Sequence, residues 1–78
     1  MAQNEHVYVS ERFGRITGTK EQLEKFRSLL ISGCAMATQH MVDFRDNGDD
    51  HMADYCWKDY LDLREEYKAL DKYLEGMQ

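Results

Sequence analysis

The sequence contains no proline and only five glycines, so long stretches carry no strong helix breaker. It also has no run close to the ~20 apolar residues that span a bilayer. Residues 1–6 lack the basic-then-apolar order of a secretory signal. These absences predict a protein that acts in the cytoplasm and away from membranes.

Cysteine and basic charge are also scarce. Cys34 and Cys56 are too few for a disulfide framework and too isolated for a zinc site, so we expect both to be small core residues. Residues 1–42 carry five Lys or Arg and four Asp or Glu, whereas residues 43–78 carry five and eleven, which places the net charge of −5 in the second half. A nucleic-acid-binding protein needs a basic face. The sequence offers none, which disfavours direct nucleic-acid binding.

The apolar content of the chain is enough for one small domain. It has 78 residues, of which 42% are hydrophobic. A core of this size rarely supplies more than ~3–5 kcal/mol of net stability, and many such chains self-associate.

A short N-terminal segment differs from the rest of the chain. Residues 6–17 are rich in β-branched and aromatic side chains, and the region from Glu11 to Gly14 can turn back, which predicts a short β-hairpin. Thr19 and Gln22 have the spacing of a capping box. Apolar residues then recur every three or four positions, which predicts a helix over residues 20–45.

The run from Asp46 to Asp50 contains Asn-Gly and is typical of a helix end, with Asp49 or Asp50 able to cap a second helix. From Cys56 to Met77 the apolar residues follow a 3.5-residue repeat, which predicts a helix over residues 51–75. A short connection makes the two helices antiparallel. The expected fold is α+β and mostly helical, with the β-hairpin packed on a two-helix hairpin in a single domain.

Two surfaces remain after the helices pair. A second stripe on the first helix would be covered by the β-hairpin or by another copy of the protein, as in a four-helix homodimer; it consists of Leu29, Gly33, Met36 and His40. The second helix presents an acidic stripe that suits a protein partner with a basic surface, with an aromatic residue at its margin. These candidate partner-binding residues are Tyr55, Trp57, Asp59, Asp62, Glu66 and Tyr73.

Motifs for catalysis are weak. Two His-x-x-Asp sets, His40 with Asp43 and His51 with Asp54, flank the predicted loop and have metal-ligand spacing, but helical geometry turns most of these side chains outward. The segment 43–54 departs from a calcium loop at its third and last positions, and residues 14–20 depart from a phosphate-binding loop in order and spacing. We therefore predict no metal site, no cofactor and no enzymatic activity, with a metal-dependent hydrolase as the remaining enzyme hypothesis.

The sequence favours a small acidic protein-binding module, an inhibitor or adaptor of the kind that phages and other mobile elements encode. Its second helix would dock on a basic or nucleic-acid-binding partner. The alternative is a homo-oligomeric bundle that binds a small ligand or metal between its protomers.

Overall fold

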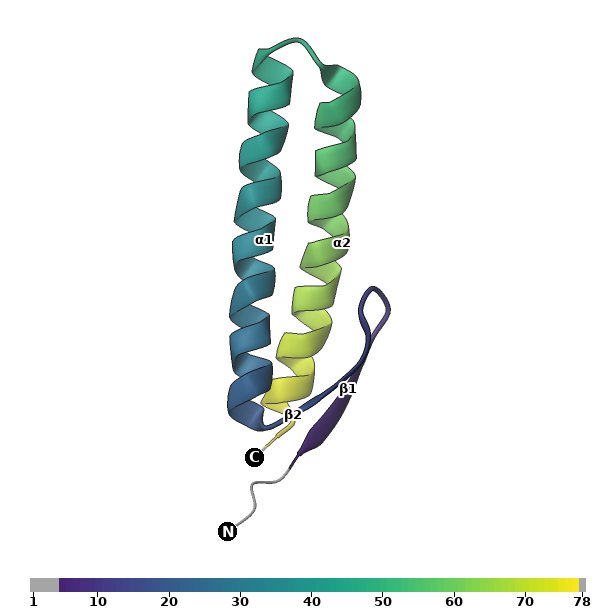
Figure 1. Cartoon of the computed structure of the whole chain (residues 1–78), viewed down its shortest axis with the longest axis vertical. Helices are drawn as coiled ribbons and strands as arrows, with labels where there is room; N and C mark the ends of the chain where they lie inside the picture. The colour runs from purple at the N-terminus through teal and green to yellow at the C-terminus, as the bar shows by residue number, and fades with distance from the viewer. Residues whose placement is uncertain (1–4, 78) are drawn as a thin grey trace.

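The computed structural model describes residues 5–77 and has the predicted α+β, mostly helical fold (Figure 1). Two strands, β1 (His6–Ser10) and β2 (Gly14–Gly18), precede two helices, α1 (Lys20–Asp46) and α2 (Asp50–Glu75). The helices run antiparallel, side by side, in a rod, and at 1.5 Å per residue each is about 40 Å long. The β-hairpin lies at the end of this rod opposite the α1–α2 loop.

The β-hairpin forms where the sequence predicts it. β1 and β2 pair antiparallel, from His6 opposite Gly18 to Ser10 opposite Gly14. Gly14 has φ +80°, a conformation that glycine adopts without strain. The hydroxyl of Ser10 accepts hydrogen bonds from the backbone N–H groups of Arg12 (3.2 Å) and Phe13 (3.0 Å), which closes the turn.

Local signals set the ends of both helices. Thr19 accepts from the N–H of Gln22, and the Gln22 side chain accepts from the N–H of Thr19, which confirms the capping box. Gly48 has φ +80° after the end of α1, and Asp49 caps α2 by accepting from the N–H of Met52. The predicted helix bounds differ from the observed ones by one residue at the end of α1 and the start of α2.

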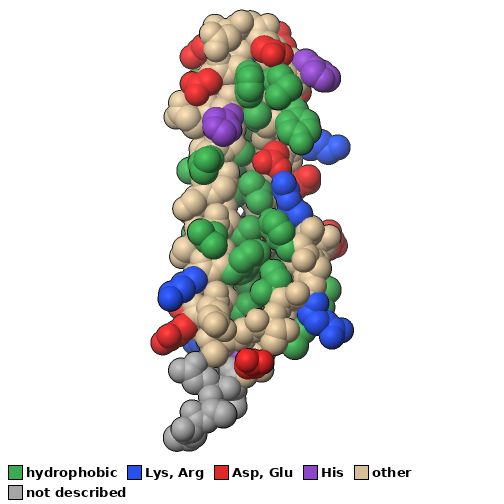
Figure 2. Space-filling view, in the orientation of Figure 1, with side chains coloured by type: hydrophobic (Ala, Val, Ile, Leu, Met, Phe, Trp, Pro, Cys, Tyr) green, Lys and Arg blue, Asp and Glu red, His purple; other side chains and the backbone are tan. Residues whose placement is uncertain are grey.

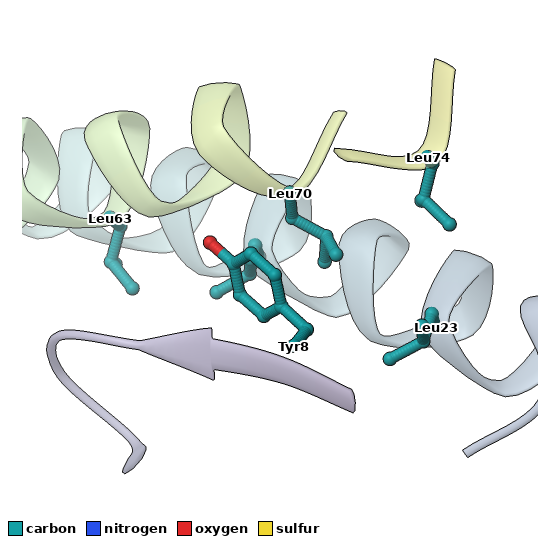
Figure 3. Close-up of a cluster of buried hydrophobic side chains, with 6 residues drawn as sticks. Tyr8, Leu23, Leu63, Leu70 and Leu74 are labelled. Atoms are coloured by element: carbon teal, nitrogen blue, oxygen red, sulfur yellow. The ribbon is translucent and has the colours of Figure 1, made fainter. Parts of the chain in front are cut away.

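Among the described residues, the large buried side chains lie in the half of the rod that carries the hairpin. Tyr8 points from β1 toward the helices and packs among leucines from both of them (Figure 3). The buried members of this cluster are Tyr8, Leu23, Leu30, Leu63, Leu70 and Leu74. Nearer the α1–α2 loop, the buried apolar residues are all small: Ala37, Ala53 and Cys56. The two ends of the helical pair are therefore stabilised unequally.

The cysteines differ slightly from expectation. Cys56 is buried, whereas Cys34 is half-buried beside the leucine cluster, and both are free thiols. Burial raises the pKa of the Cys34 thiol, and the nearby Asp59 carboxylate adds to the effect while Arg64 opposes it.

A candidate docking groove

A buried carboxylate holds the β-hairpin on α2. Glu66 is only 7% exposed and accepts a hydrogen bond from the Ser10 hydroxyl (2.8 Å) and another from the backbone N–H of Arg12 (2.9 Å). Ser10 itself is 3% exposed. Because both oxygens of the carboxylate are used, burying its charge is compensated by charge-assisted hydrogen bonds.

Three further contacts set the position of the hairpin. Arg12 forms an ion pair with Asp59 at 2.7 Å. The Tyr73 hydroxyl donates to the carbonyl of Val7 (3.0 Å), and the rings of Tyr73 and Tyr8 lie 5.4 Å apart. On the other side, the ring of Phe13 meets the Phe26 ring of α1 edge to face, 5.5 Å away. The hairpin therefore contacts both helices, and its polar contacts are all with α2.

The hairpin and the exposed side of α2 together form a groove of about 870 Å³. One wall comes from β1 and the turn after it, and the other from four turns of α2. The lining residues are Tyr8, Val9, Glu11, Arg12, Tyr55, Lys58, Asp59, Asp62, Glu65, Glu66 and Ala69.

The groove is acidic. Two of its five carboxylates are already engaged, because Glu66 holds the hairpin and Asp59 pairs with Arg12. Glu11, Asp62 and Glu65 are exposed and form no ion pair within residues 5–77. Lys58 is the one groove cation not committed to Asp59. A ligand entering the groove thus meets an excess of negative charge.

One titrating group of the groove is perturbed. Burial raises the pKa of the Tyr8 hydroxyl above its ordinary value, and the charge and hydrogen bonding of Glu66 raise it further, with a smaller contribution from Glu11. Tyr8 therefore stays neutral beside the carboxylates.

The structure brings four of the six predicted partner-binding residues into this groove: Tyr55, Asp59, Asp62 and Glu66. The expectation that Glu66 belongs to an exposed stripe is wrong, because the hairpin covers it. Tyr73 packs against β1 instead of lining the groove. Trp57 lies outside the groove, 45% exposed and stacked on Tyr60 at 5.1 Å between ring centroids.

The predicted oligomer stripe on α1 divides in a similar way. Leu29 and Met36 are 68% and 59% exposed, and His40 is also exposed. Gly33 is instead part of the contact with α2: a Cβ added there would lie 3.3 Å from the nearest Leu63 methyl. The β-hairpin leaves Leu29 and Met36 uncovered.

The two His-x-x-Asp sets do not converge. His40, Asp43, His51 and Asp54 are all exposed. Within the part of the chain that the structure describes, no three His, Cys, Asp or Glu side chains lie together as potential metal ligands.

Sequence reasoning missed seven of the eleven residues that line the groove. Glu65 and Lys58 lie on α2 beside the predicted acidic stripe. A wider stripe drawn on the same helix would have included both. Glu11 and Arg12 carry no such signal, because their place beside α2 depends on contacts between residues more than fifty positions apart.

Comparison with protein-family models, curated proteins and solved structures finds no match to this chain. Neither helix, over the residues described, has a stretch long and apolar enough to cross a bilayer.

Proposed function

We propose that this protein is a non-enzymatic binding module that uses the groove between β1 and α2 to hold a basic segment of another protein. The observation that carries the proposal is the set of three exposed carboxylates, Glu11, Asp62 and Glu65, which form no ion pair within residues 5–77 and line one groove. Lysine and arginine side chains of a partner would neutralise them. By covering a basic surface, the module would act as an inhibitor or adaptor.

Tyrosine adds apolar contact area to the same groove. Tyr55 lines it and is 66% exposed, so its ring is available to a partner. Tyrosine is common at the centres of protein interfaces because it offers a large rigid surface at low entropic cost. A basic segment with apolar residues between its lysines would use both features.

Charge reversal in the full-length protein tests this proposal. A groove variant carries Glu11→Lys, Asp62→Lys and Glu65→Lys, all at exposed positions. A matched control carries Asp46→Lys, Asp54→Lys and Glu75→Lys, also exposed and outside the groove. Each set changes the net charge from −5 to +1, since three reversals add six. Asp59 and Glu66 are left intact because they hold the hairpin.

The probe is a fluorescent lysine- and leucine-rich peptide, followed by anisotropy at low salt and at ~0.5 M salt, where exposed charge pairs are screened. We expect the groove variant to lose at least about tenfold in affinity while the control stays within a few fold of the parent protein. Equal loss in both variants would mean that only net charge attracts the peptide. Unchanged binding by the groove variant would also reject the proposal. The same pair of variants then serves to identify cellular partners that depend on the groove.

A further inference from the structure

The middle of α1 is unlike the rest of the protein because it carries no charge. Residues 28–42 contain no Asp, Glu, Lys or Arg, although charged residues make up 32% of the chain and about five would be expected in a stretch of this length. At 1.5 Å per residue the uncharged stretch covers about 22 Å of helix. In Figure 2 the middle of α1, on the left, shows hydrophobic and neutral atoms, with charged side chains only toward its ends.

Nine of the fifteen residues in this stretch are exposed in the monomer. Its exposed members are Ser28, Leu29, Ile31, Ser32, Ala35, Met36, Gln39, His40 and Val42. All the large exposed apolar side chains of the two helices lie between residues 29 and 61, a stretch in which the buried residues are Leu30 and the smaller Ala37, Ala53 and Cys56. Depletion of charge together with exposed apolar side chains is typical of the core of a protein interface.

Six residues on the side of α1 away from α2 follow a second 3.5-residue repeat, with steps of four, three, four, three and four, and every one is exposed: Lys25, Leu29, Ser32, Met36, Gln39 and Asp43. A repeat of this period lets a helix contact another helix along its length. The inner repeat of α1 is already used by α2. The outer repeat is therefore available to a third helix.

The outer repeat complements itself in one orientation. In an antiparallel pair of identical helices related by a two-fold axis, residues whose numbers sum to a constant face each other. With a sum of 68, Lys25 faces Asp43, Leu29 faces Gln39 and Ser32 faces Met36. Opposite charges meet at both ends, and the large Met36 meets the small Ser32. A parallel pair would instead place Lys25 against Lys25 and Asp43 against Asp43.

We propose that the occupant of the outer face of α1 is a second copy of this chain, in an antiparallel α1–α1 homodimer with Lys25 of each copy paired to Asp43 of the other. The groove lies on α2, so the dimer would present two grooves to a partner with repeated basic segments.

Charge reversal tests the proposal independently of the groove. Sedimentation equilibrium of the full chain is expected to give a mass of twice 9.2 kDa at high concentration. Lys25→Glu and Asp43→Lys should each weaken the dimer by about tenfold, because both symmetric ion pairs become repulsive, and the double variant should restore it. Met36→Glu should weaken the dimer by about a hundredfold or more, whereas Met52→Glu, on the exposed side of α2, should leave it unchanged. Circular dichroism of each variant verifies that the helices remain folded.

Three results would overturn the proposal. A parent protein that stays monomeric at high concentration excludes the dimer. A dimer that persists in Met36→Glu places the interface elsewhere. If Met36→Glu abolishes the dimer but the double variant of Lys25→Glu and Asp43→Lys does not restore it, the interface is on α1 but the antiparallel register is excluded. None of these results affects peptide binding in the groove, because Glu11, Asp62 and Glu65 are unchanged in every variant.

Discussion

Replacing Glu66 should release the β-hairpin from the helices. Glu66→Ala removes the acceptor of two hydrogen bonds, one from the Ser10 hydroxyl and one from the N–H of Arg12. Hydrogen bonds to a charged group contribute about 1.5–3 kcal/mol each, so we expect the variant to lose about 3 kcal/mol. The core of a domain this size supplies only about 3–5 kcal/mol in total. A single substitution at this position therefore removes most of the net free energy of unfolding.

Two measurements separate local release from global unfolding. Urea unfolding followed by far-ultraviolet circular dichroism gives the free energy of unfolding. Amide hydrogen exchange of β1 and β2 reports the hairpin alone, and its protection should be lost even where the helical amides remain protected. Glu66→Gln keeps the shape and removes the charge, so it should show a smaller loss of about 1 kcal/mol.

The matched control is Glu65→Ala, at the neighbouring but exposed position, which should change stability by less than about 0.5 kcal/mol. Ser10→Ala combined with Glu66→Ala completes a double-mutant cycle, and the two effects should be clearly non-additive because the side chains share a hydrogen bond. If Glu66→Ala retained the parent's urea midpoint and the protection of its strands, the reasoning about the buried carboxylate would be wrong.

Three further predictions concern stability. Leu70→Ala, at a fully buried position, should cost about 3 kcal/mol in urea unfolding, whereas Leu61→Ala, 38% exposed, should cost about 1 kcal/mol or less; equal losses would contradict the assigned core. Gly48→Ala should cost about 1 kcal/mol because φ is +80° there, and a melting temperature equal to the parent's would refute this. Because the pKa of Tyr8 is raised in the folded state, the stability that this neutral hydroxyl contributes is complete below the pKa of the unfolded state, near 10. That stability is lost as the pH rises through the pKa of the folded state. As the pH rises above about 10, the melting temperature should therefore fall more for the parent than for Tyr8→Phe, and parallel curves would reject a role for this hydroxyl.

Local sequence determined the elements of this fold. Thr19 with Gln22, Gly48 and Asp49 set the ends of the helices through interactions within four residues, and the period of the apolar residues identified both helices and the faces that meet. These signals can be read from the sequence because each depends on neighbours along the chain.

Only the tertiary structure decided how the β-hairpin sits and what it covers. The acidic stripe on α2 was visible in the sequence, but the sequence does not distinguish Glu66, which is buried beneath the hairpin, from Asp62, which is exposed on the same helix. The contacts that make the difference join residues 54 to 66 positions apart. Periodicity shows which side of a helix a residue is on, whereas the solvent exposure of that side depends on where a distant segment of the chain packs.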